Sequence, residues 1–300
     1  MALAAHDFVA QPGQKVRLSR VPTDRTPGIK GKEGAVELLV KNADAIADAQ
    51  ELLYAQDRWA LLVILQARDA AGKDSTIKHV MRGVNPQGVT VTSFKAPSTL
   101  ELDHDYLWRS VLALPARGLI GIHNRSYYEE VLVARVHPEI LARQQLPDEV
   151  RTKDIWVDRY RQINKFERYL VENGTRVLKF FLHVSQDEQR RRFLERVDDP
   201  SKNWKFSLRD LKESAHWADY DRAYEEAIEA TSTRHAPWYI IPADHKWYLH
   251  LAVGHVIVET LKSMKLRVPP LDAERRRELA EGRRLLGGGG RAKKAKSSRA

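Results

Sequence analysis

The feature that most constrains the fold is an apolar run that leads directly into a loop of small residues and then into a helical pattern. Leu61–Leu65 is apolar and β-prone, the loop Gln66–Lys73 contains Ala-Ala-Gly-Lys, and apolar residues recur at helical spacing up to Met81. A strand, a small-residue loop ending in Gly-Lys and a helix form a P-loop unit. Its backbone N–H groups and helix dipole attract anions. The sequence therefore predicts phosphate-binding groups at Ala70, Ala71, Gly72 and Lys73.

Two residues depart from the usual G-x-x-x-x-G-K-[ST] pattern, and a third adds a carboxylate. Ala67 stands at the first glycine, and Asp74 stands where a Ser or Thr would ligate Mg²⁺. Asp69 lies inside the loop, where a carboxylate repels phosphate unless it holds a metal or orients an acceptor. We therefore predict that Asp69 is catalytic and binds the metal. The alternatives are that Asp69 only caps the next helix, or that the loop is an ordinary strand-to-helix turn.

Five short apolar runs alternate with helix-length segments along the chain. They are Leu61–Leu65, Val89–Phe94, Leu119–His123, Val177–Val184 and Trp238–Ile241. The alternation predicts an α/β fold with one five-stranded parallel sheet flanked by helices. We expect an N-terminal arm over residues 1–34, a P-loop domain over 35–270 with a helical lid at about 186–233, and a disordered basic tail over 271–300.

The net charge of +10 is concentrated at the C-terminal end of the chain. Residues 283–300 hold seven basic side chains and no acidic one, so the rest of the chain is only mildly basic and we expect no nucleic-acid partner. No apolar run approaches the roughly 20 residues that span a bilayer, so we expect no membrane association. The chain has no cysteine, which excludes disulfides and thiolate chemistry and is consistent with the expected cytoplasmic location.

Several segments, in order along the chain from Leu38 to Leu266, resemble the polyphosphate kinase 2 family. The phosphate-loop block is followed by Asn-Pro-Gln-Gly-Val at 85–89 and Asn-Arg-Ser-Tyr-Tyr-Glu-Glu at 124–130. A segment at 198–207, Asp-Asp-Pro-Ser-Lys-Asn-Trp-Lys-Phe-Ser, is similar to the family's lid signature. Further matching segments are Ser93–Ser98, Glu101–Arg109, Pro237-Trp238 and Pro242–Trp247.

The resemblance implies a thymidylate-kinase-like core that transfers phosphoryl groups between inorganic polyphosphate and the nucleotides AMP, ADP and ATP. It implies Mg²⁺, or Mn²⁺ in its place, and a homo-oligomer, either a dimer or a tetramer. Lys73 would hold bound phosphates, and Asp69 would position the acceptor phosphate and the metal. Arg125 would stabilise charge on the transferring group. Such a reaction needs positioning and charge neutralisation more than covalent chemistry.

The second motif bears on the subclass. Many family members carry Asp-Arg where this chain has Asn124-Arg125, and the Asn form resembles the class III branch, which accepts both AMP and ADP. An amide in place of a carboxylate lowers the negative charge near the phosphates. Glu129 would restore part of the metal or acceptor function; the alternative is a solvated carboxylate on the first turn of a helix.

Basic residues supply a polyphosphate track and an acceptor site. A track for a long polyanion should be cationic and sensitive to salt. The family match favours phosphate contacts by Arg192, Arg196, Lys202 and Lys205. Lys95 and Arg109 lie where the α-phosphate of a nucleotide docks in related kinases, and arginine suits bidentate phosphate binding.

Two other functions compete with polyphosphate-dependent nucleotide phosphorylation. An ATP-dependent nucleoside or nucleotide kinase would share the loop, but a small acceptor needs no long cationic lid. A polyanion-binding protein without activity would explain the basic tail, but not the ordered set of phosphate motifs.

Overall fold

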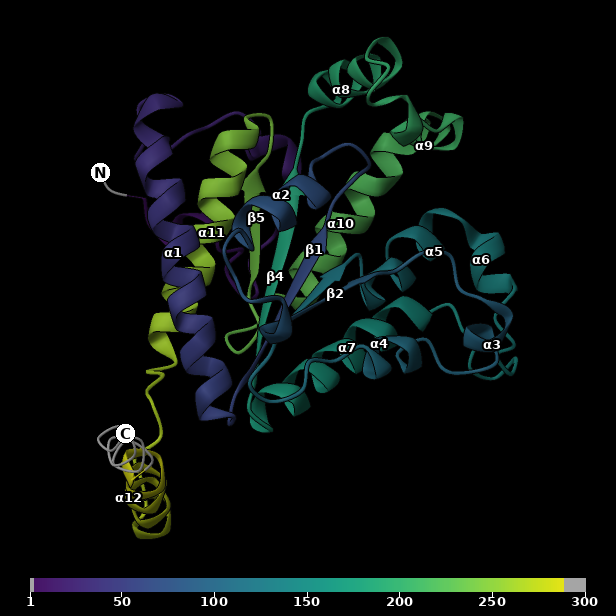
Figure 1. The fold of residues 1–300 in the computed structure, drawn as a ribbon. Helices are drawn as coiled ribbons and strands as arrows, with labels where there is room; N and C mark the ends of the chain where they lie inside the picture. Colours follow the sequence, from purple (N-terminus) through teal and green to yellow (C-terminus); the bar gives the residue numbers. More distant parts are fainter. Residues whose placement is uncertain (1–2, 289–300) are drawn as a thin grey trace, which may run out of the picture. The chain divides into compact units, whose positions relative to one another are not determined.

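Five parallel strands form a single sheet in the computed structural model, which describes residues 3–288 (Figure 1). The order across the sheet is β2-β3-β1-β4-β5. The strands are β1 (Ala60–Gln66), β2 (Val89–Ser93), β3 (Ile120–Asn124), β4 (Thr175–His183) and β5 (Trp238–Pro242). All five coincide with the apolar runs to within two residues at either end, so the predicted five-stranded parallel sheet is confirmed.

The sheet positions the site because β1 and β3 are neighbours that end at the same edge. Leu65 pairs with Asn124, so the phosphate loop after β1 lies beside the Asn124-Arg125 pair after β3. Every residue of β1 is buried, as expected for a central strand covered on both faces. Ligands of parallel α/β sheets bind beyond the carboxyl ends of the strands, and both predicted motifs lie at that edge.

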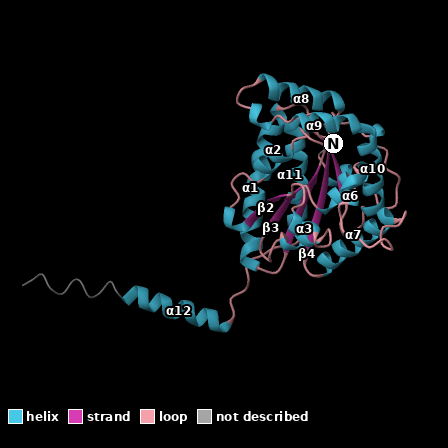
Figure 2. Ribbon diagram, turned by 90° about the vertical axis from the view of Figure 1, so that its right-hand side faces the viewer, coloured by secondary structure: helices cyan, strands magenta, loops and turns pink. Residues whose placement is uncertain are grey.

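Helices cover both faces of the sheet (Figures 1 and 2). On one face α1 (Glu33–Gln56), α2 (Lys73–Val80) and α11 (Lys246–Ser263) enclose one apolar core with β1 and β4. On the other face α7 (Ile155–Glu172) and α10 (Trp217–Thr231) enclose a second one. Short helices connect the rest: α3 (Thr99–Leu102), α4 (Trp108–Leu112), α5 (Val133–Val136) and α6 (Pro138–Ala142). Among the described residues, no helix is long and apolar enough to cross a bilayer.

The N-terminal arm is packed against this body. Phe8 and Leu18 are buried, and Val9 forms an isolated antiparallel bridge with Tyr239 of β5. The arm therefore contributes apolar side chains to both cores.

The expectation of a disordered tail is wrong for most of its described part. The described residues from Arg267 onward form a unit of their own, in which α12 occupies Ala273–Gly288. Arg275 pairs with Glu278 and Arg284 with Glu281 at i,i+3 spacing, which supports a helix rich in good helix formers. The rest of the predicted tail, residues 289–300, lies outside the described residues.

The predicted lid is helical, but it does not extend to residue 233. Its helices are α8 (Gln186–Asp198), α9 (Leu208–Glu213) and α10. Tyr224 and Ile228 of α10 are buried in the second core, so this helix belongs to the body of the fold. The part that lies over the carboxyl edge of the sheet is therefore α8, α9 and the loop between them (Figure 1).

Candidate active site

The phosphate loop connects β1 to α2 through two residues with left-handed backbone. Ala70 has a φ of 60° and Gly72 a φ of 117°. A Cβ at Gly72 would lie 3.2 Å from Leu249 Cδ2 and 3.3 Å from Ser75 Oγ, so both conformation and space favour glycine. A loop of this shape followed by a helix N-terminus presents backbone N–H groups to an anion.

Lys73 begins α2 and folds back over the loop. Its Nζ donates to the carbonyl of Ala67 at 2.9 Å and approaches that of Arg68 at 3.4 Å. Burial, together with the positive charge of Arg125, lowers the pKa of Lys73 to about 8, although Asp69 and other nearby carboxylates oppose the shift. A bound phosphate would favour the charged form of this lysine.

The structure brings together Asp69, Arg125 and Glu129, as the sequence predicted for one site. Arg125 Nη2 donates to Asp69 Oδ1 at 2.7 Å, and Arg125 Nη1 donates to Glu129 Oε2 at 3.0 Å. These two carboxylates, Glu129 first, raise the pKa of Arg125 above its already high value. Arg125 itself has a φ of 66°, a left-handed conformation that is uncommon outside glycine and clusters at functional sites.

Asn124 lies at the same edge but contacts a different carboxylate. Its Nδ2 donates to Asp74 Oδ1 at 2.7 Å and approaches Ser93 Oγ at 3.4 Å. The residue that replaces the usual Ser or Thr of the loop is therefore held by the residue that replaces the usual Asp of the second motif. Sequence reasoning singled out both departures without linking them.

A buried ion pair anchors the turn that carries Arg125 and Glu129. Tyr127 and Tyr128 follow in the 3₁₀ helix η4 (Tyr127–Glu130), and both hydroxyls donate to Glu167 Oε1, at 2.9 and 2.8 Å. Lys179 of β4 donates to Glu167 Oε2 at 2.6 Å, and both charged side chains are 0% exposed. The turn is thereby fixed to the centre of the sheet.

A cleft of about 490 Å³ lies between the loop and the lid. Predicted site residues that line it are Asp69, Ala70, Gly72, Lys73, Lys95, Asn124, Arg125, Arg192, Arg196, Lys202 and Lys205. Ala71 is buried beneath the loop. Glu129 lines a separate small cavity, which also receives Asp69 and Arg125.

The basic side chains of the lid differ in whether they are already paired with a carboxylate. Lys202 is paired with Glu195 at 2.6 Å and with Asp199 at 2.7 Å. Arg196 Nη1 donates to the carbonyl of Lys205 at 3.2 Å and lies 3.7 Å from Asp210. The ammonium of Lys205 lies over the Trp204 ring at 4.8 Å and forms no ion pair within the described residues.

The predicted phosphate contact of Arg192 is wrong for this geometry. Its side chain is 3% exposed, and its guanidinium donates to the backbone carbonyls of Ala70 and Ala71 and to those of Ala243 and Asp244, which follow β5. Its Nε donates to Glu188 at 2.7 Å. Arg192 thus binds the underside of the phosphate loop and leaves no N–H free for a ligand.

Sequence reasoning missed Lys246, which lines the cleft at the first residue of α11. It forms no ion pair or hydrogen bond with any described residue, and burial together with Arg192 lowers its pKa. Its position shortly after the fifth strand, which ends at Pro242, was the available signal, because that strand ends at the same edge of the sheet.

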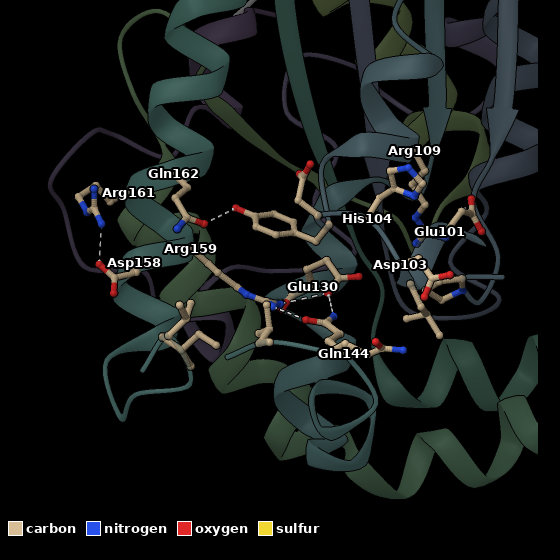
Figure 3. A pocket seen from close by; sticks show the side chains of 18 residues that line it. Glu101, Asp103, His104, Arg109, Glu130, Gln144, Asp158, Arg159, Arg161 and Gln162 are labelled. Carbon is tan, nitrogen blue, oxygen red and sulfur yellow. Dashed lines mark hydrogen bonds and ion pairs between the residues drawn. The ribbon is translucent and has the colours of Figure 1, made fainter. Parts of the chain in front are cut away.

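On the acceptor side, Arg109 supports Lys95. Arg109 Nη1 donates to the carbonyl of Lys95 at 2.8 Å, and its side chain is only 9% exposed. It also lines a cavity of about 690 Å³ between α3–α4 and the segment that leads into α7. Figure 3 shows Arg109 beside Glu101 on one wall and Arg159 between Glu130 and Gln144 on the other.

A parallel sheet in this order, with a Gly-Lys loop between β1 and a helix, defines a P-loop kinase fold. A family model described as polyphosphate kinase 2 (PPK2) matches residues 30–269, and the chain belongs to this family.

Similar proteins agree with this assignment over nearly the whole length. An ADP-polyphosphate phosphotransferase from Rhodopseudomonas palustris is 50% identical over 287 residues, covering 95% of this chain and 99% of the relative. An AMP/ADP-polyphosphate phosphotransferase from Meiothermus ruber is 46% identical, covering 87% and 94%. A crystal structure of polyphosphate kinase 2 from Arthrobacter aurescens TC1 is 39% identical, with a TM-score of 0.81, and covers 94% of this chain and 100% of that one.

Proposed function

We propose that this protein transfers phosphoryl groups from inorganic polyphosphate to AMP and ADP. The observation that carries the proposal is the Asp69–Arg125 pair beside Lys73, in a cleft roofed by the basic lid segment. The names of the relatives from Rhodopseudomonas palustris and Meiothermus ruber support polyphosphate as donor and adenine nucleotides as acceptors. In each transfer an acceptor phosphate oxygen forms a bond to the terminal phosphorus, and the anhydride bond breaks with its electron pair on the shortened polyphosphate.

The residues of the loop and the second motif divide the work between binding and charge stabilisation. The loop N–H groups and Lys73 hold the phosphates on either side of the transferring group. Arg125 lies where charge on that group develops, and exchanges one carboxylate partner for phosphate oxygens. Asp69 faces the same space; its carboxylate would repel an incoming phosphate by itself, but would hold a cation that attracts and aligns the acceptor phosphate.

The donor set fits Mg²⁺ bound jointly by protein and substrate. Asp69 Oδ1 accepts from Arg125, while Oδ2 accepts no hydrogen bond from a described residue. The described residues include no group of three or more His, Cys, Asp or Glu side chains arranged for a metal. Mg²⁺ in kinases is held by one or two carboxylates and by substrate phosphates, so Asp69 suffices as the protein ligand. The metal would neutralise phosphate charge, and Mn²⁺ has the same oxygen preference.

Polyphosphate runs through the cleft beneath the lid. The ammonium groups of Lys205 and Lys246 have no carboxylate partner among residues 3–288, and Lys202 and Arg196 can exchange their carboxylate partners for phosphate. The acceptor approaches from the Lys95 side, with its nucleoside in the cavity of about 690 Å³ beyond Arg109. That volume is in the range of small-molecule sites.

A direct assay tests the proposal. Purified protein is incubated with Mg²⁺ and polyphosphate and with AMP, ADP, GMP or GDP, and the nucleotide products are separated. We expect ADP and ATP from the adenine acceptors, and loss of turnover in Asp69→Ala and Lys73→Ala variants that keep a wild-type circular dichroism spectrum. Transfer from ATP but not from polyphosphate would reject the proposal.

Acceptance of both AMP and ADP, as in the class III branch, is part of this proposal. The amide of Asn124 supports it, because it adds no negative charge beside the carboxylate of Asp74, to which it donates. A homo-oligomer and a cytoplasmic location stay predictions. Size-exclusion chromatography with light scattering tests the first, and cell fractionation the second.

A further inference from the structure

The first lid helix, α8, holds three consecutive carbonyl groups of the phosphate loop. Gln189 Nε2 donates to the carbonyl of Asp69 at 2.9 Å. Arg192 Nη1 donates to the carbonyls of Ala70 at 3.0 Å and Ala71 at 2.7 Å. Gln189 and Arg192 are three residues apart and so lie on the same face of α8, and both are buried.

The remaining carbonyls of the loop are bound from within the loop and α2. Lys73 Nζ donates to the carbonyls of Ala67 and Arg68, and the hydroxyl of Thr76 donates to the carbonyl of Gly72 at 2.9 Å. Every carbonyl from Ala67 to Gly72 thus accepts a hydrogen bond from a side chain. Buried backbone groups must be paired, and here the pairing also fixes the direction of each peptide plane.

The orientation of these planes determines where the loop N–H groups point. In a trans peptide the N–H points away from the preceding C=O, so carbonyls held by α8 turn the N–H groups of Ala70 and Gly72 in the opposite direction. Asp69, Ala70 and Gly72 line the cleft, together with part of Arg192. Ala70 needs this support, because it holds a left-handed conformation without being glycine.

Arg192 cannot also bind substrate, because its five N–H groups are already used. Nη1 donates to two carbonyls of the loop, and Nη2 donates to the carbonyls of Ala243 and Asp244 at 2.6 and 3.0 Å. Nε donates to the carboxylate of Glu188. One planar group therefore joins α8, the phosphate loop and the end of β5. Lysine, with a single compact ammonium, cannot reproduce this fork.

We infer that Gln189 and Arg192 are positioning residues that set the phosphate-binding shape of the loop, and that α8 is a fixed support of the site. The inference deepens the proposed function and rests on it for its kinetic readout. It predicts that losing either side chain impairs the transfer step, because a displaced cradle no longer matches the transferring phosphoryl group. Polyphosphate affinity should change little, because the cleft cations stay in place.

The experiment compares Arg192→Lys, Arg192→Gln and Gln189→Met with two controls. Arg190→Gln removes the same charge from an exposed position of α8, and Lys205→Gln removes a cation that faces the cleft. For each protein, kcat and the KM for polyphosphate are measured at several salt concentrations, and folding is checked by thermal unfolding. Gln189→Met changes no charge, so it remains informative if an Arg192 variant fails to fold.

We expect kcat to fall about tenfold or more for Arg192→Lys and Gln189→Met, with KM for polyphosphate within about threefold of wild type and an unchanged salt dependence. Arg190→Gln should behave as wild type, and Lys205→Gln should raise KM and flatten its salt dependence. The inference is overturned if Arg192→Lys keeps wild-type kcat, or if Arg192→Gln behaves like Lys205→Gln. Wild-type protein that fails to use polyphosphate would instead reject the proposed function.

Discussion

The buried Lys179–Glu167 pair allows a quantitative test of how the turn at Arg125 is anchored. Replacing Lys179 by Met keeps the length and the apolar stem of the side chain but leaves Glu167 buried with only two tyrosine hydroxyls as donors. Removing one partner of a fully buried ion pair costs about 3–5 kcal/mol. For a cooperative unit the size of residues 1–266, that loss lowers Tm by about 6–12 °C.

The free energy of unfolding is measured by urea titration, followed by tryptophan fluorescence. Lys165→Met is the matched control, because Lys165 is exposed on α7, the same helix that carries Glu167, and its loss should change stability by less than about 0.5 kcal/mol. The double variant Lys179→Met/Glu167→Gln leaves no unpaired charge, so it should be less destabilised than the sum of the two single variants. A cost below about 1 kcal/mol for Lys179→Met, or strict additivity, would refute this account of the anchor.

Three further predictions concern the cleft. Because the pKa of Lys73 is about 8 in the free protein, kcat/KM should fall as the pH rises through about 8. Bound phosphate should shift the fall in kcat to higher pH. A kcat/KM that stays constant up to about pH 9.5 contradicts this prediction. Asn124→Asp would place a second carboxylate beside that of Asp74, so activity should fall more at pH 8 than at pH 6. The ratio of AMP to ADP use should also change. An equal loss of activity at both pH values argues against repulsion between the two carboxylates. Lys246→Gln should raise KM for polyphosphate at low salt and lose that effect at high salt, measured by initial rates; an unchanged KM removes it from the track.

The sheet and the position of the site were predictable because both depend on local patterns. Apolar runs of strand length identify central parallel strands, and the Gly-Lys loop marks the edge where ligands bind. Asp69 and Arg125 meet because β1 and β3 are adjacent, a consequence of the fold that the family resemblance implied. Most of the residues that the sequence predicted for the site line the cleft, whereas Arg109 and Glu129 line two other cavities and Ala71 is buried.

The roles of individual cations were not predictable, because the sequence does not distinguish a basic residue that binds a ligand from one that donates to a backbone carbonyl. Arg192 shares its side of α8 with Gln189 and Phe193, a buried face that was visible only as helical spacing among many charges. Lys246 was missed although it lies in the matching segment Pro242–Trp247, because the resemblance identified that segment only as part of the fifth strand and its end. The helix α12 depends on i,i+3 pairs within a segment whose basic composition suggested disorder.

The pairing of three cleft cations with carboxylates has a consequence for which polyanions can enter. Arg125, Arg196 and Lys202 each lie beside an acidic side chain, so a ligand that binds at these three positions must replace those contacts. RNA and DNA carry one charge per nucleotide on a widely spaced backbone, whereas polyphosphate carries a charge on every closely spaced unit. We therefore expect the cleft to select by charge density, and to exclude nucleic acids even in a protein with a net charge of +10.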